Sequence, residues 1–160
     1  MQTVLASRSP EETFEFGRRI GARLGGAAIV LLEGDLGSGK TLMAKGLYLG
    51  YGGQDVDDVV SPSYTIVNIY DGAPRPVYHV DLYRLEDPRH LLGLEYEDFL
   101  YLNPGLTIVE WPRSAPDLLD ADDYLMVRFD RGDGDDQRRI TLLAEGSRYA
   151  EVFAEFAASC

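Results

Sequence analysis

Apolar residues along the chain fall into short runs that are separated by glycine, proline and acidic breaks. Residues 9–24 space their apolar side chains along one helical face, begin with the capping sequence Ser-Pro-Glu-Glu and end before two glycines, which predicts a helix. Short uninterrupted apolar runs predict buried strands instead. We expect strands at residues 27–32, 77–84, 106–110, 124–129 and 139–143, and another at the end of the loop-like stretch 61–70.

The predicted helices and strands alternate, which is typical of an α/β fold. Further helices are expected at residues 42–49, at 87–102 as one broken or two short helices, and at 146–158. A turn signal at residues 71–74 predicts that the flanking strands form a hairpin. A chain of 160 residues buries enough surface to fold as one domain. We therefore predict a single domain over residues 1–160, a three-layer α/β sandwich with a mixed, mostly parallel sheet.

One segment carries a chemical motif. Residues 34–41 read Gly-Asp-Leu-Gly-Ser-Gly-Lys-Thr and match the phosphate-binding pattern G-x-x-x-x-G-K-[ST]. The motif follows a predicted strand and leads into a predicted helix, which is the context of a P-loop NTPase. A glycine-rich turn without a ligand is the alternative, but such a turn has no use for Lys40 and Thr41 in this register.

Each position of the motif has a predicted task. The glycines let successive backbone N–H groups turn toward phosphate oxygens, and the following helix adds the positive end of its dipole. Lys40 would bring a charge to the β- and γ-phosphates, and the Thr41 hydroxyl would contact Mg²⁺. We predict that ATP and Mg²⁺ are bound by Asp35, Leu36, Gly37, Ser38, Gly39, Lys40, Thr41 and Leu42.

Two acidic residues follow apolar strand-like runs and are candidates to complete the site. Glu110 comes directly after residues 106–109, and Asp81 after residues 77–80. A carboxylate at such a strand end can reach Mg²⁺ or orient the attacking water. Both assignments stay open at this point, because an edge-strand or capping carboxylate would look the same in sequence.

Charge and composition limit the partners. The formal net charge of −12 disfavours direct contact with tRNA or another polyanion, because such binding relies on Lys and Arg. The only cysteine, Cys160, allows no intramolecular disulfide, and the two histidines are too few for a zinc site built on imidazole. With no signal-like N-terminus and no apolar stretch long enough for a bilayer, we expect a cytoplasmic protein and no membrane partner.

Four motifs together resemble the TsaE family, formerly YjeE, of bacterial tRNA threonylcarbamoyladenosine biosynthesis ATPases. They are residues 34–41, 61–65, 79–85 and 109–112, in the family's order and spacing over nearly the whole chain. The resemblance implies a P-loop ATPase that acts with the proteins TsaB and TsaD. Together they would place a threonylcarbamoyl group on the adenosine next to the anticodon of tRNAs that read codons beginning with A. TsaD would perform the transfer, so tRNA would be held by the partners.

The resemblance also implies roles for single residues. Thr41 and Glu110 would contact Mg²⁺, and Asp81 is the aspartate of the family's D-L-Y-R motif. Residues 61–65 would be a nucleotide-sensing switch, which makes Thr65 a catalytic candidate beside Lys40, Asp81 and Glu110. The N-terminal segment, residues 9–13, and the late hairpin, residues 130–139, would approach the adenine.

The chain departs from the family pattern at two positions, and two other functions are compatible with the phosphate loop. Leu42 replaces a threonine that could contact the α-phosphate, and Ser63 replaces a threonine of the switch. A small-molecule kinase can be built on the same loop, but no arginine-rich lid is evident. A nucleotide-gated switch without catalysis is the other alternative, and a GTPase version would need an Asn-Lys-x-Asp base reader that the sequence lacks.

Overall fold

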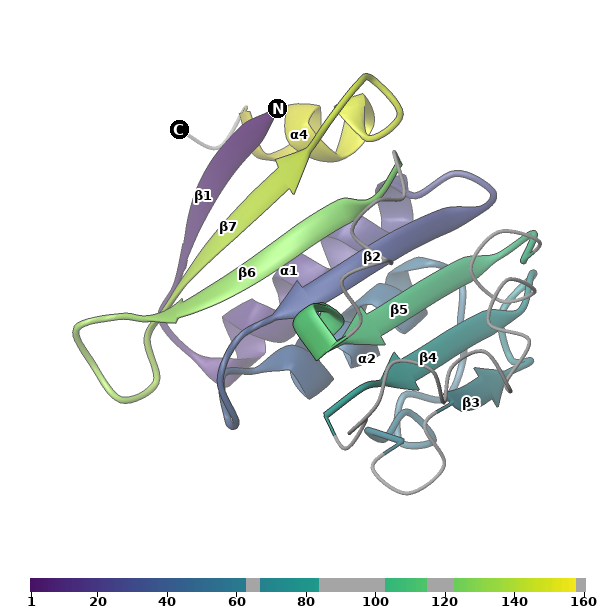
Figure 1. The fold of residues 1–160 in the computed structure, drawn as a ribbon, viewed down its shortest axis with the longest axis horizontal. Coiled ribbons are helices and arrows are strands. Elements are labelled where there is room, and N and C mark those ends of the chain that lie inside the picture. Colours follow the sequence, from purple (N-terminus) through teal and green to yellow (C-terminus); the bar gives the residue numbers. More distant parts are fainter. Residues whose placement is uncertain (63–66, 84–102, 115–122, 158–160) are drawn as a thin grey trace.

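A seven-stranded sheet runs through the described part of the chain, with helices packed against it (Figure 1). The structure is a computed structural model that describes residues 1–62, 67–83, 103–114 and 123–157. The strands are β1 (Gln2–Ser7), β2 (Ala28–Glu33), β3 (Val67–Tyr70), β4 (Val77–Asp81), β5 (Leu106–Glu110), β6 (Leu125–Arg131) and β7 (Arg138–Ala144). The helices are α1 (Pro10–Arg23), α2 (Lys40–Gly50), the 3₁₀ turn η2 (Pro112–Ser114) and α4 (Ala150–Ala157).

The strands lie in the order β1-β7-β6-β2-β5-β4-β3. The four central strands, β6, β2, β5 and β4, pair in parallel, and the outer pairings on both sides are antiparallel. Every residue of β5 is buried, as expected for a parallel strand that is covered on both faces. The predicted α/β class with a mixed sheet is confirmed, and so is the hairpin of β3 and β4.

The predicted first helix is confirmed with its cap. The Ser9 hydroxyl accepts a hydrogen bond from the Glu12 N–H at 3.2 Å, and the Glu12 carboxylate accepts one from the Arg8 N–H at 2.7 Å. This is a variant of the capping box in which Glu12 reaches back to the N–H of the residue before the N-cap, and Pro10 stands at the first helical turn, where its missing N–H costs nothing. The start of α1 is therefore set by four consecutive residues of local sequence.

Two clusters of buried apolar side chains lie on opposite faces of the sheet. The larger one joins the sheet to α1, α2 and α4, whose Phe16 and Phe156 rings meet edge to face at 5.9 Å. The smaller cluster lies on the other face and contains Leu31, Val80, Leu82, Val109 and Met126. The helical stretch predicted at 87–102 lies outside the described residues.

One strand was not predicted from the sequence, and several predicted helix and strand boundaries differ from those in the structure. Strand β1 was not predicted, although it pairs with β7 from Gln2 opposite Leu143 to Ser7 opposite Arg138. It is an edge strand whose side chains are mostly exposed or half-buried, so the apolar signal of a buried strand is missing. Strands β6 and β7 are longer than predicted, while α4 begins only at Ala150. Within the described residues no helix is long and apolar enough to cross a membrane.

Helices α1 and α2 touch through their backbones, because glycines line the contact. A Cβ added to Gly46 would lie 2.2 Å from the Phe14 carbonyl oxygen, and one added to Gly50 would lie 2.0 Å from that of Arg18. The α1 side repeats this with Gly17 and Gly21 against carbonyls of α2. This close approach fixes the position of α2, and with it the loop that joins β2 to α2.

We predict that Gly46→Ala lowers the free energy of unfolding by about 1–3 kcal/mol, because the two helices must separate to admit the methyl group. Gly25→Ala is the matched control, since a Cβ there would have no neighbour within 4 Å. That variant should stay within about 0.5 kcal/mol of the parent chain. Urea denaturation measures both, and equal stabilities would refute the tight helix contact.

Candidate functional site

The carboxyl ends of three central strands meet at one edge of the sheet. In the parallel register Glu110 of β5 lies beside Asp81 of β4 on one side and beside Leu32 of β2 on the other. Ligands of parallel α/β sheets bind at such an edge. Both acidic residues that the sequence singled out therefore come next to the loop that follows β2.

The loop between β2 and α2 has the conformation that a phosphate cradle needs. Gly37 and Gly39 have φ angles of 73° and 108°, in the left-handed region that glycine tolerates. Gly39 caps the N-terminus of α2, where free N–H groups and the helix dipole favour an anion. A Cβ at Gly34 would lie 2.6 Å from the Ser38 hydroxyl oxygen, so the loop closes tightly on itself.

The Lys40 ammonium lies at the mouth of this loop. Nζ donates to the carbonyl oxygens of Gly34 at 2.6 Å and Asp35 at 2.8 Å, and more weakly to the Ser38 hydroxyl at 3.4 Å. It also lies 4.2 Å from the centre of the Trp111 ring. Trp111 has a φ of 59°, which a non-glycine residue adopts at a cost, and its N–H donates to the carbonyl of β2 at Leu32. The strained backbone thus holds the indole against the lysine.

Burial lowers the pKa of the Lys40 ammonium, since only 5% of the residue is exposed. Carboxylates nearby oppose this shift without cancelling it, and they belong to Glu110, Asp81 and Asp35. Added negative charge from a phosphate would favour the ammonium form further.

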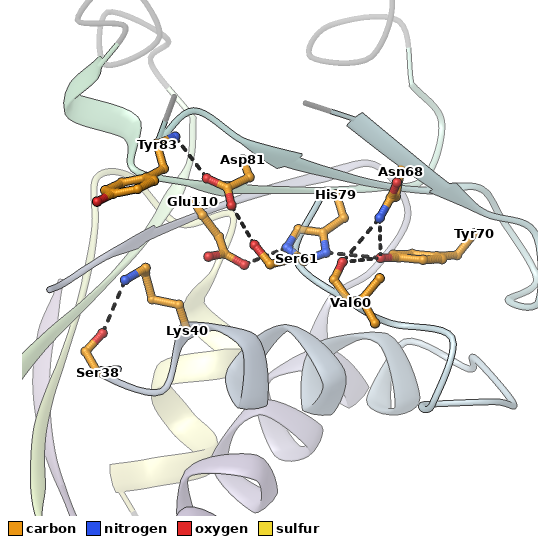
Figure 2. Close-up of polar contacts among 10 residues, drawn as sticks. All are labelled: Ser38, Lys40, Val60, Ser61, Asn68, Tyr70, His79, Asp81, Tyr83 and Glu110. Atoms are coloured by element: carbon orange, nitrogen blue, oxygen red, sulfur yellow. Dashed lines mark hydrogen bonds and ion pairs between the residues drawn. The ribbon is translucent and has the colours of Figure 1, made fainter. Parts of the chain in front are cut away.

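The two candidate carboxylates are buried but differ in their partners (Figure 2). Both oxygens of Asp81 accept hydrogen bonds, Oδ2 from the Ser61 hydroxyl at 2.5 Å and Oδ1 from the Tyr83 N–H at 2.9 Å. Glu110 uses Oε1 in a 2.8 Å contact with His79 Nε2. Its Oε2 has no hydrogen-bond partner among the described residues. Within the described part of the chain, Glu110 thus has one oxygen without a hydrogen bond, whereas both oxygens of Asp81 accept one.

A cavity of about 520 Å³ joins the predicted residues. Its walls include Leu36, Gly37, Ser38, Gly39, Lys40, Thr41, Leu42, Ser61, Asp81, Tyr83, Glu110 and Trp111. Asp35 instead lines a second cavity of about 500 Å³ on the other side of the loop. Thr65 lies outside the described residues. The structure therefore brings Lys40, Asp81 and Glu110 together, and their roles stay predictions.

The donor set fits a magnesium-bound triphosphate. The cradle offers backbone N–H groups and an ammonium to phosphate oxygens, and Thr41 and Glu110 offer a hydroxyl and a carboxylate oxygen at the same cavity. In residues 1–62, 67–83, 103–114 and 123–157 no three His, Cys, Asp or Glu side chains are placed to hold a metal. The Thr41 hydroxyl and the Glu110 carboxylate suit Mg²⁺, which commonly takes one or two protein ligands together with substrate phosphates and water.

Several residues around the site were not found from sequence. Glu33, directly before the loop, forms an ion pair with Arg128 at 2.6 Å and another with Arg113. Arg138 donates to the carbonyl oxygens of Gly37 and Ser38, each at 3.1 Å. These arginines are remote in sequence from the loop, so no local pattern links them to it. Through Arg138 the late hairpin reaches the loop.

The chain is similar in sequence to known proteins of one family. The family model of the threonylcarbamoyl adenosine biosynthesis protein TsaE matches residues 7–140. The tRNA threonylcarbamoyladenosine biosynthesis protein TsaE of Bacillus subtilis (strain 168) is 37% identical over 147 residues, which are 92% of this chain and 89% of that protein. The protein of the same name from Nostoc sp. is 37% identical over 145 residues, 89% of this chain and 80% of that one.

A solved structure agrees with the same assignment. The crystal structure of YdiB from Bacillus subtilis is similar with a TM-score of 0.75 and 29% sequence identity. The similarity covers 99% of this chain and 96% of that chain.

The ion pairs of Glu33 predict a pH effect on stability. Burial raises the pKa of the Glu33 carboxyl, but Arg128 and Arg113 outweigh burial and hold the pKa below its ordinary value. The stabilisation is then complete above the ordinary pKa and is lost as pH falls through the lower folded-state pKa. Glu33→Gln should cost about 1 kcal/mol at pH 7, and the difference should shrink toward pH 3. Unfolding by urea across this range measures it, with the exposed Glu145→Gln as control, and a difference independent of pH would contradict the assignment.

Proposed function

This chain belongs to the family of the threonylcarbamoyl adenosine biosynthesis protein TsaE, and we propose that it is a Mg²⁺-dependent ATPase. The observation that carries the proposal is the cavity in which the phosphate-loop residues face Glu110 and Asp81. In the cytoplasm the chain would supply ATP turnover for formation of N6-threonylcarbamoyladenosine in tRNAs that read codons beginning with A.

The loop residues would bind and orient the triphosphate. The N–H groups at the start of α2 would donate to the phosphate oxygens, and Lys40 would leave its loop carbonyls to meet the β- and γ-phosphates. Thr41 would offer its hydroxyl to the metal. When bound, Mg²⁺ would supply positive charge that offsets the negative charge of the phosphates.

The two carboxylates would divide the remaining tasks. Glu110 would hold the metal, directly or through water, because its Oε2 has no other partner among the described residues. Asp81 would keep Ser61 and the Tyr83 backbone in place around the cavity, since both of its oxygens accept hydrogen bonds from them. Lys40 would stabilise the charge that develops on the transferred phosphoryl group.

The partners would be TsaB and TsaD, with TsaD performing the transfer. The net charge of −12 supports this division, because an acidic chain is poorly suited to hold tRNA itself. Contact with tRNA would then be indirect.

Phosphate release tests the site. We expect Lys40→Ala and Glu110→Gln each to lower kcat/KM for ATP hydrolysis about 100-fold, since each removes a charge that acts on the phosphates or the metal. Lys45→Ala removes the same charge from the next turn of α2 and should leave the rate near that of the parent chain. The assay uses radiolabelled ATP with and without TsaB and TsaD.

Two outcomes of this assay would overturn the proposal. Phosphate release that is insensitive to both substitutions would discard the site. Label that appears on a small acceptor instead of as free phosphate would identify a kinase.

The role in tRNA modification has its own test. Depletion of this chain in its host should remove threonylcarbamoyladenosine from tRNA, and a plasmid copy with Lys45→Ala should restore the nucleoside while one with Lys40→Ala should not. Mass spectrometry of digested tRNA measures this. Unchanged tRNA after depletion would leave only a nucleotide-gated switch.

A further inference from the structure

His79 is fully buried in β4 and lies between two polar groups (Figure 2). Its Nε2 is 2.8 Å from Oε1 of Glu110, and its Nδ1 is 3.2 Å from the hydroxyl oxygen of Tyr70. The sequence reading gave His79 no role. A buried imidazole costs more desolvation than an apolar side chain of the same size, so its hydrogen bonds must offset that cost.

The contacts define where the protons lie. A carboxylate oxygen only accepts, so the neutral imidazole donates Nε2–H to Glu110 and accepts at Nδ1 from the Tyr70 hydroxyl. The Tyr70 hydroxyl has one proton for two acceptors, Nδ1 at 3.2 Å and the Val60 carbonyl at 3.0 Å. When the proton goes to Nδ1, the Asn68 side-chain amide donates to the Val60 carbonyl at 3.2 Å and to the hydroxyl oxygen at 3.5 Å. Every member of the network then has a partner without placing a second charge in the core.

The network ends at the segment that also holds the second carboxylate. Val60 lies at its outer end, joined to Tyr70 through the Asn68 amide, and the next residue, Ser61, donates to Asp81. Val60 is therefore connected to Glu110, and Ser61 to Asp81, by two separate sets of hydrogen bonds. A displacement of this segment would disturb both.

We propose that His79 is a positioning residue that fixes the Glu110 carboxylate, and that Tyr70 together with the Asn68 amide couples this carboxylate to the backbone at Val60. The inference rests on the proposed function in one respect, namely that Glu110 holds Mg²⁺. With His79 on Oε1, the carboxylate cannot rotate freely, and Oε2 stays turned toward the cavity. Partners of metal-binding carboxylates act in this way in many proteins, and their loss typically costs about 10- to 100-fold in metal affinity.

The first test examines the hydrogen bonds without nucleotide or metal. The chain has two histidines, so a ¹⁵N imidazole NMR spectrum is simple, and its comparison with His79→Gln identifies the signals of His79. We expect a protonated Nε2 and an unprotonated Nδ1. Tyr70→Phe should shift mainly Nδ1, and Glu110→Gln mainly Nε2. The opposite tautomer, or shifts that ignore both substitutions, would overturn the network.

The second test measures Mg²⁺ binding rather than turnover. Trp111 is the only tryptophan and lines the cavity, so its fluorescence reports titration of the ADP-loaded protein with Mg²⁺. His79→Leu keeps a comparable volume without hydrogen bonds and should raise the Mg²⁺ concentration at the midpoint about 10-fold. ADP binding without Mg²⁺ should not change. His79→Gln, which can still donate to Glu110, should restore most of the affinity.

Tyr70→Phe isolates the outer half of the network and should raise the same midpoint by a smaller factor, about 3-fold. Tyr51→Phe is its matched control, because the Tyr51 hydroxyl likewise makes a hydrogen bond, to the Gly26 carbonyl, away from the cavity. Should His79→Leu fail to fold, the Tyr70→Phe midpoint and the NMR test decide the question, and an unchanged midpoint would refute the coupling.

The two possible failures can be told apart. A parent chain whose fluorescence does not respond to Mg²⁺ would refute the proposed metal site, and with it the coupling of His79 to a metal. A parent chain that responds, together with unchanged midpoints for His79→Leu and Tyr70→Phe, would refute only the positioning role.

Discussion

The register of three parallel strands is the constraint on which the rest of the structure depends. Hydrogen bonds between β2, β5 and β4 place Leu32, Glu110 and Asp81 side by side at one edge. A slip of one residue in either pairing would turn a carboxylate to the opposite face of the sheet, since side chains alternate along a strand. The register is protected because β5 is buried along its whole length, and a slip would move each side chain to packing partners on the opposite face that do not fit it. The same packing that stabilises the core therefore sets the geometry of the candidate site.

This geometry gives a physical reason for a metal requirement. Two buried carboxylates and one buried ammonium face the same cavity, so the side chains alone leave an excess of negative charge there. A triphosphate would add to that excess next to Glu110 and Asp81, at a low effective dielectric where repulsion is strong. Lys40 and the N-terminus of α2 can offset only part of it. A divalent cation held by Glu110 would offset the remainder, which is a physical reason to expect nucleotide and metal to bind this cavity together.

Much of this arrangement can be read from sequence, and the part that cannot has a common cause. The phosphate loop, the strand that ends at Glu110 and the capping box of α1 each depend on a few adjacent residues, and the four-motif resemblance to the TsaE family is confirmed. Strand β1 was missed because an edge strand needs few buried side chains. His79 and Glu33 were missed because their partners come from other strands, and only the folded sheet brings them together. The sequence indicated them only by the presence of a polar side chain within, or at the end of, an apolar strand.

The same distinction explains what the buried network adds. Apolar packing fixes where a strand runs, but it leaves the end of a glutamate side chain free to rotate about its χ angles. A directional contact is needed to remove that freedom, and His79 supplies it from the neighbouring strand at 2.8 Å. The histidine is in turn held by Tyr70, so the orientation of Glu110 depends on the antiparallel pairing of β3 with β4 as well as on the parallel core. Val60, at the outer end, is 53% exposed, whereas His79 is fully buried. Hydrogen bonds thus connect a surface position to a carboxylate in the cavity.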